Sequence, residues 1–368
     1  MMMKFARSIG SAFDSLTVDG VPMGKIEAMD HFGRLSEGRK KDETWKEDLH
    51  HLVRDLMMGG SSIPAHTSGT TGAPKAMRIA RRDLVNSARL TAETFGLHEG
   101  NRVLLCLPCA FIAGKMMVVR AMALGLDLHV TDPRGAVLEN LNPEDHFRFA
   151  AMVPLQLHRA IQDDRTRVER QFDTILLGGG PVSEALEDDL QGLSTAVFHG
   201  YGSTETVTHV AVRRLNGPGR RKAYAAIGRV HFETDERGCL VVHTPHLSTK
   251  RHVTNDQVNL IDDRHFQWLG RMDHVILSGG KKFFPEQLER ITAGVVPCPH
   301  YFTAIPHERL GQAVCLVLET DRGPDEVADE VIQAVMRVLP PHQWPRRIVA
   351  LRAFPRTASG KIIRQRIA

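Results

Sequence analysis

The chain has 368 residues, of which 42% are hydrophobic and 24% are charged. This length favours about two domains, and this balance excludes an intrinsically disordered or fibrous chain. The 47 Lys and Arg residues nearly balance the 43 Asp and Glu residues, which leaves a net charge of +4 with both signs mixed along the chain, so we do not expect nucleic acid among the partners.

The composition also bears on the compartment. No run approaches about 18 apolar residues, and the first residues lack the apolar core of a signal peptide, so we expect a cytoplasmic protein with no membrane-inserted segment. The five cysteines are odd in number and widely spaced, which argues against a disulfide framework. Cys106 and Cys109 lack a second pair at zinc spacing, and we interpret both as buried thiols.

The middle of the chain alternates between strand-like and helix-like segments. The expected elements are strands at 103–107, 126–130, 174–177 and 195–199, a buried helix at 112–124, a glycine turn at 178–180 and a helix from Ser183. This alternation predicts an α/β fold with a mixed or parallel sheet, whose ligands bind beyond the strand ends.

The pattern of apolar and polar residues changes after about Arg213. Short β-like segments at 238–244, 257–261 and 265–269 predict a small antiparallel unit. Beyond them we expect a helix from Pro285, a strand at 313–318, a helix at 325–338 and a strand at 347–351. The domains are therefore predicted at 1–271, a large N-terminal domain, and at 272–368, a small mobile α+β domain.

The segment that carries most chemistry is a loop of small polar residues that ends in a lysine. Its members are Thr67, Ser68, Gly69, Thr70, Thr71, Gly72, Ala73, Pro74 and Lys75. The glycines let the backbone approach an anion, and the hydroxyls and Lys75 can surround phosphate oxygens. It is not a Walker loop, because Pro74 precedes the lysine and Ala76 follows it. A nucleotide is implied, on a fold other than that of P-loop proteins.

Together with four later segments in the same order, this loop resembles the AMP-forming adenylate-forming enzymes, which include acyl-CoA synthetases. The later segments are 200–205 (GYGSTE), 255–256 (ND, with Asn255 where the family usually has Gly), 270–273 (GRMD) and 355–361 (PRTASGK). The resemblance spans residues 67 to 361, nearly the whole chain. It implies ATP, Mg²⁺ and CoA as cofactors, and a carboxylic acid as the substrate.

The resemblance also implies a role for each matched residue. Lys75 and the loop would hold the β- and γ-phosphates, Glu205 would ligate Mg²⁺, and Tyr201 would stack on adenine. Asp256 and Arg271 would hold the ribose. Further nucleotide-binding positions are Gly179, Gly200, Gly202 and Thr204. Taken alone, Tyr201 is also compatible with a core aromatic, and Asp256 with a surface ion pair.

Lys361 would stabilise the charge that develops as the carboxylate attacks the α-phosphate. The resemblance further implies that the C-terminal domain then rotates about Asp273. That rotation would bring the turn at Ser278, Gly279 and Gly280 into place, where a pantetheine arm could pass closely.

Two cations in the apolar segment 112–124, Lys115 and Arg120, bear on the acid substrate. A buried charge needs an anionic partner, which a dicarboxylate would supply. Thr206, Thr208 and His209 could donate to the same substrate. Surface exposure or pairing with a protein acid is the alternative for both cations, and a packed core histidine is the alternative for His209.

Segments 107–116, 204–211 and 278–280 look most like those of short 2-succinylbenzoate–CoA ligases of menaquinone synthesis, compact members without much of the first subdomain. Three other interpretations stay open: a CoA ligase for another aromatic or medium-chain acid, an enzyme that loads a carrier protein, and a homologue that only binds nucleotide. The sequence also leaves open whether the chain forms a homo-oligomer.

Overall fold

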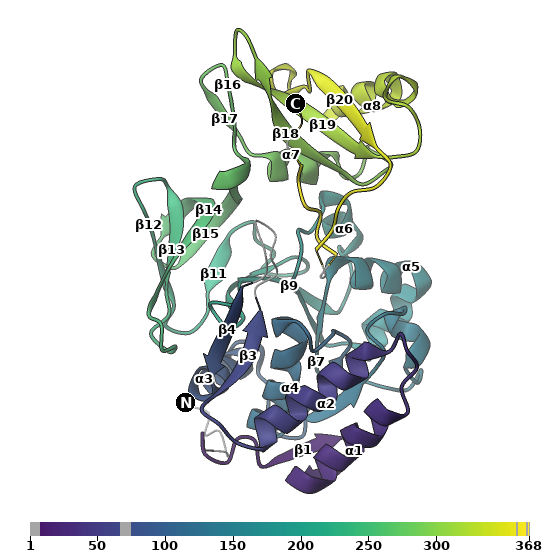
Figure 1. The fold of residues 1–368 in the computed structure, drawn as a ribbon, viewed down its shortest axis with the longest axis vertical. Helices are drawn as coiled ribbons and strands as arrows, with labels where there is room; N and C mark the ends of the chain where they lie inside the picture. Colours follow the sequence, from purple (N-terminus) through teal and green to yellow (C-terminus); the bar gives the residue numbers. More distant parts are fainter. Residues whose placement is uncertain (1–7, 67–74, 358–359, 366, 368) are drawn as a thin grey trace.

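The computed structural model describes residues 8–66, 75–357, 360–365 and 367, with side chains described except at 324–328. Thirteen strands form one large sheet, and a second sheet of five strands lies above it in Figure 1. The mixed α/β class expected from the sequence is confirmed. Among the described residues, no helix is both long and apolar enough to span a bilayer.

One half of the large sheet is mostly parallel. Its spatial order is β9, β8, β7, β5, β6, β1, β2, and only the edge strand β2 runs antiparallel to its neighbour. The strands are β1 (Ser15–Val18), β2 (Val21–Gly24), β5 (Arg102–Leu105), β6 (Asp127–Val130), β7 (Phe149–Met152), β8 (Thr174–Leu177) and β9 (Ala196–Gly202). Because parallel strands end at one edge, the segments after β8 and β9 come together there.

The other half of the large sheet is antiparallel. It contains β10 (His209–Arg214), β11 (Tyr224–Ala226), β12 (His231–Thr234), β13 (Cys239–His243), β14 (Arg251–Asp262) and β15 (His265–Arg271). The antiparallel pairing was expected, but these strands are not a separate unit. The short strand β11 pairs with both β10 and β15, which makes the hydrogen-bonded ladder continuous.

Six helices accompany the large sheet: α1 (Lys25–Glu37), α2 (Thr44–Met57), α3 (Arg81–Phe95), α4 (Ile112–Leu124), α5 (Pro154–Gln171) and α6 (Glu184–Asp189). The apolar segment 112–124 is α4, and ten of its residues are buried because α2, α3 and the sheet all contact it. The helix expected from Ser183 is α6, and the Ser183 hydroxyl caps it by accepting from the Leu186 N–H.

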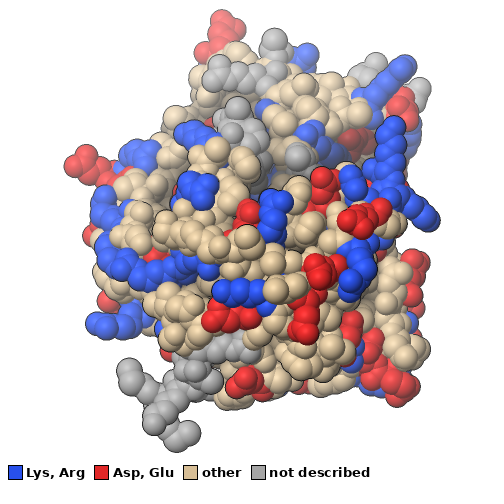
Figure 2. All heavy atoms as spheres, turned by 60° about the horizontal axis from the view of Figure 1, so that its bottom comes forward, with Lys and Arg blue, Asp and Glu red and all other residues tan. Residues whose placement is uncertain are grey.

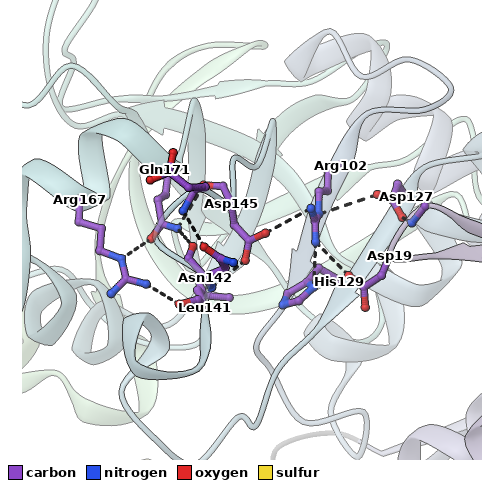
Figure 3. A network of polar contacts seen from close by, with 11 residues as sticks. Asp19, Arg102, Asp127, His129, Leu141, Asn142, Asp145, Arg167 and Gln171 are labelled. Carbon is purple, nitrogen blue, oxygen red and sulfur yellow. Dashed lines mark hydrogen bonds and ion pairs between the residues drawn. The ribbon is translucent and has the colours of Figure 1, made fainter.

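An ion cluster fixes the start of the parallel strands. Arg102, the first residue of β5, lies 3.0 Å from Asp19 and 3.2 Å from Asp145, and its guanidinium lies over the Phe147 ring. Figure 3 shows these contacts joining the turn after β1 to the segment before β7. The cluster lies at the start of the strands, opposite the edge where β8 and β9 end, and we assign it a structural role.

The smaller sheet contains β16 (Ile276–Ser278), β17 (Lys281–Phe283), β18 (His300–His307), β19 (Gly311–Glu319) and β20 (Arg347–Leu351). It packs with α7 (Pro285–Thr292) and α8 (Pro324–Val338) around its own core. The helices expected from Pro285 and over 325–338 are confirmed. Short 3-10 turns complete the chain: η1 (Val137–Asn140), η2 (Met272–His274), which joins the two sheets, and η3 (Pro341–Gln343).

Cysteine chemistry and surface charge also agree with the sequence analysis. All five cysteines are free, and burial raises the pKa of Cys106 and of Cys109 to about 12, so both are inert thiols. Figure 2 shows Lys and Arg side chains lying beside Asp and Glu side chains over one face.

Candidate active site

The site begins at the hairpin of β3 (Ser62–His66) and β4 (Ala76–Ala80). Thr67, Ser68, Gly69, Thr70, Thr71 and Gly72, the expected phosphate loop, lie outside the described residues. Lys75 is described and exposed, directly before β4. The Thr204 hydroxyl donates to the His66 carbonyl at 3.5 Å, which brings the end of β3 beside the turn that follows β9.

Three residues expected at the nucleotide lie together, with Tyr201 and Arg271 at the ends of β9 and β15 and Asp256 in the middle of β14. The Tyr201 hydroxyl donates to Asp256 Oδ2 at 2.6 Å, and Arg271 Nη1 lies 3.8 Å from Asp256 Oδ1. Asp256 and Arg271 are directly opposite in the ladder, so the sheet register sets their spacing. Burial and the Asp256 charge hold the pKa of Tyr201 well above its usual value, so the hydroxyl stays protonated and donates.

Lys361 joins this group from the other end of the chain. Burial and the charge of Arg271 lower its pKa, and Asp256 opposes them, so the ammonium lies within the field of both residues. A tight turn holds it: the Lys361 N–H donates to the Thr357 hydroxyl at 3.1 Å, and the Thr357 N–H donates to the Lys361 carbonyl at 2.8 Å. Three residues further on, Arg364 makes a partly buried ion pair with Glu289 of α7.

The turn between β9 and β10 is strained. Val207 is buried yet has φ = 67°, which is rare for a β-branched residue and costs about 1–3 kcal/mol. A Cβ on Gly202 would lie 2.1 Å from the Thr208 carbonyl oxygen, so only glycine fits there. This geometry leaves Glu205 exposed at the turn.

Thr206 is used within this turn. Its hydroxyl accepts from the Ser203 N–H at 2.9 Å and donates to the Thr208 carbonyl at 2.9 Å. A hydroxyl has one proton to donate, and Thr206 donates it to the Thr208 carbonyl. The structure therefore gives Thr206 a different role from the substrate contact expected, that of holding the turn.

Arg120 lies inside the molecule, with 1% of its side chain exposed. It donates to the Thr91 hydroxyl at 3.2 Å and to the Thr208 hydroxyl at 3.3 Å, and its guanidinium faces the Phe149 ring at 5.9 Å. Within the described ranges no carboxylate pairs with it. Burial alone lowers its pKa to about 9, so it remains a cation at neutral pH.

His209 borders the same place. Its ring packs against Phe95, and its buried Nε2 has no hydrogen-bond partner among the described residues. Burial and the neighbouring Arg120 hold the pKa of His209 well below its usual value, so the ring is neutral. An orphaned polar nitrogen and a cation without a carboxylate thus share one buried, aromatic-lined place, which is an unusual arrangement for a core.

Lys115 is not part of this group. Burial lowers the pKa of Lys115, and the charges of Asp48 and Asp55 on α2 oppose that shift. Five residues separate it from Arg120, so the two cations emerge from different sides of α4. The two were expected to share one anionic substrate, but the structure gives Lys115 acids of the protein itself.

One group of residues at the site was missed by the sequence analysis. The Tyr224 hydroxyl lies 2.8 Å from His199 Nδ1, and His199 Nε2 lies 3.1 Å from the Gly180 carbonyl. A carbonyl only accepts, so Nε2 carries the proton and Nδ1 accepts from Tyr224. This chain fixes the glycine turn after β8, where Gly179 has φ = 79°. The position of His199 directly before Gly200 and Tyr201 was the available signal.

The residues expected to form the hinge and the pantetheine tunnel lie further along the chain. Asp273 accepts from Arg271 Nη2 at 2.8 Å, at the junction of the two sheets. Ser278, Gly279 and Gly280 form the turn between β16 and β17, and both glycines have positive φ. This turn belongs to the smaller sheet, not to the strands that hold Tyr201 and Asp256.

Comparison with known proteins gives the class. Residues 62–237 match the family model described as AMP-binding enzyme, and residues 301–361 match its C-terminal domain. An acyl-CoA synthetase (AMP-forming)/AMP-acid ligase II-like protein from Dyadobacter fermentans is 34% identical, with a TM-score of 0.58, over 89% of this chain and 95% of that one. The chain therefore belongs to the AMP-binding enzyme family and is an AMP-forming ligase.

More distant relatives carry one recurring name. A 2-succinylbenzoate–CoA ligase from Oceanobacillus iheyensis is 23% identical over 82% of this chain and 68% of the relative. The o-succinylbenzoate CoA synthetase MenE from Bacillus subtilis, in complex with the acyl-adenylate intermediate OSB-AMP, matches 95% of this chain and 94% of that one. Its TM-score is 0.74 at 18% identity, a likeness that concerns the fold.

Proposed function

We propose that this protein is an ATP-dependent acid–CoA ligase that activates 2-succinylbenzoate. It would first join one carboxylate to the α-phosphate of ATP, with release of pyrophosphate. CoA would then displace AMP to give the thioester. The name shared by several curated relatives supports this substrate.

The observation that carries the proposal is Arg120, a fully buried cation with no carboxylate partner among the described residues. Only one carboxylate of 2-succinylbenzoate is adenylated, so the other stays ionised and needs a cation in its pocket. Arg120 would bind it, with Thr208 and the free Nε2 of His209 as further hydrogen-bonding groups. The surrounding Phe95 and Phe149 suit the aromatic ring of the acid.

The remaining residues would serve the nucleotide. Tyr201 and the turn at Gly179, held by His199, would enclose the adenine, and Asp256 would accept from the ribose hydroxyls. The donor set fits Mg²⁺, because an exposed carboxylate, Glu205, lies beside the start of the phosphate loop at His66 and Thr204. The ion would neutralise phosphate charge, and Glu205 would hold it.

Lys361 would lie between the acid and the nucleotide. Its ammonium lies in the field of Asp256 and Arg271, so it can place positive charge where the transition state gains negative charge. We further propose that residues 272–368 form a mobile body that rotates about Asp273 after adenylation. That rotation would withdraw Lys361 and bring the turn at 278–280 to the site.

Pyrophosphate release across a panel of acids tests the proposal. The panel contains 2-succinylbenzoate and benzoylpropionate, which has the same chain and ring but no ring carboxylate, each with and without CoA. Release with 2-succinylbenzoate at least about a hundredfold faster is expected from one buried carboxylate–arginine pair. Equal rates would assign the protein to another acid.

A further inference from the structure

Asn255 lies directly before Asp256 in β14, and its side chain makes hydrogen bonds on both sides. Its Nδ2 donates to the hinge residue Asp273, at 3.2 Å to Oδ1 and 3.4 Å to Oδ2. Its Oδ1 accepts from Arg237 Nη1 at 3.0 Å. A glycine at position 255 could make neither contact.

The orientation of the amide is fixed by its neighbours. Arg237 only donates and the Asp273 carboxylate only accepts, so the oxygen of Asn255 must face the arginine and its nitrogen must face the acid. Arg237 is itself held by Asp235 at 2.8 Å and by the Thr254 carbonyl at 3.0 Å. All of these anchors belong to the antiparallel half of the large sheet.

Asp273 is therefore held from the large sheet by two residues, Asn255 and Arg271. On the other side of the hinge, His274 contacts Glu286 of α7, so the residue after Asp273 is fixed to the C-terminal body. Between these attachments, a rotation about the N–Cα bond of Asp273 turns its side chain away from the large sheet and breaks the contacts to Asn255 and Arg271.

We propose that Asn255 is a positioning residue that acts through Asp273: it holds the hinge in the conformation that keeps Lys361 at the nucleotide site. This inference rests on the two-step function proposed above. The hydrogen bond to a carboxylate favours the adenylating conformation, and its loss shifts the population toward the thioester-forming one. Because the pair is half-exposed, the shift amounts to about threefold to tenfold.

The test is Asn255→Gly, with Asn259→Gly as the matched control. Asn259 is an exposed asparagine on the same strand β14, opposite Gln267, and the two substitutions have the same backbone cost. Each half-reaction is measured alone, as pyrophosphate release with 2-succinylbenzoate and as thioester formation from supplied 2-succinylbenzoyl-adenylate and CoA. Asn255→Gly is expected to speed thioester formation about threefold to tenfold without speeding adenylation, and Asn259→Gly is expected to do neither.

A parallel change in both half-reactions, or identical behaviour of the two variants, would overturn the role of Asn255. Amide hydrogen exchange over residues 272–275 gives a readout that needs no turnover, and faster exchange in Asn255→Gly than in Asn259→Gly is expected. If no acid released pyrophosphate, the proposed function would fail, whereas hydrogen exchange would still decide whether Asn255 holds the hinge.

Discussion

On the proposed nucleotide side of the site, the polar groups pair with one another, whereas the cation on the proposed acid side has no carboxylate within the described ranges. Tyr201, Asp256 and Arg271 form a chain of contacts with one another. The hydrogen-bond partners of Arg120 among the described residues are all neutral: Thr91, Met117 and Thr208. This difference matches the two proposed ligands. The neutral sugar needs aligned hydrogen bonds, which the paired groups supply, and the ionised acid needs a charged partner, which Arg120 supplies.

The largest expected effect concerns Lys361, which is proposed to lie between the two sides. Lys361→Ala removes the charge between acid and nucleotide, and adenylation should fall by about 1,000-fold or more because transition-state stabilisation is lost. Thioester formation from supplied acyl-adenylate should change less than about threefold, as measured by CoA consumption. Equal losses in both half-reactions would contradict the assignment of Lys361 to the first step alone.

The acid side is tested by Arg120→Leu. Adenylation of 2-succinylbenzoate should fall by about 100-fold in kcat/KM, and that of benzoylpropionate should not fall. The same variant should raise Tm by a few degrees, because an unpaired buried charge is replaced by an apolar side chain in an apolar helix. Calorimetry without ligand measures this gain, and a loss of stability would mean that Arg120 serves the fold.

The nucleotide side should respond more mildly. Tyr201→Phe keeps the ring but removes the hydrogen bond to Asp256, so KM for ATP should rise about fivefold while kcat stays within about twofold. Initial rates at varied ATP measure this split. A fall in kcat with unchanged KM would place the hydroxyl in the chemical step.

The smallest effect is on pH dependence. Burial and Arg271 lower the pKa of Lys361, so its charge is lost at a pH below the ordinary lysine value of 10.5. The rate of adenylation should therefore begin to fall at a lower pH than expected for a free lysine. Lys361→Arg should react more slowly but lose this decline, because a guanidinium keeps its proton. An alkaline limb that survives in Lys361→Arg would belong to another group.

How far the sequence predicted the fold depends on where each segment is buried. The α4 helix matched its predicted bounds, because a helix covered on several sides is apolar all round. By contrast, β14 was expected over five residues and has twelve, since its first half is a partly exposed strand of polar residues. No elements were predicted before residue 66, where α1 and α2 are amphipathic and mostly polar.

The residues of the site were also predicted only in part. Motif order predicted Tyr201, Asp256, Arg271 and Lys361, which the structure brings together although they lie far apart in the chain. The acids beside Lys115 and the Tyr224–His199 contact were missed, because each depends on packing between segments remote in sequence. The contact of Asn255 with Asp273 was missed for the same reason, although the sequence analysis had noted an asparagine at this position.

The buried charge of Arg120 also bears on how long the protein survives in a cell. Burying this cation without a carboxylate partner among the described residues lowers the free energy of unfolding, and a dicarboxylate bound as proposed would offset that loss. Ligand bound only by the folded state lowers the unfolded fraction that proteases remove. The amount of enzyme would then follow the supply of its acid, with no regulator other than the arginine itself.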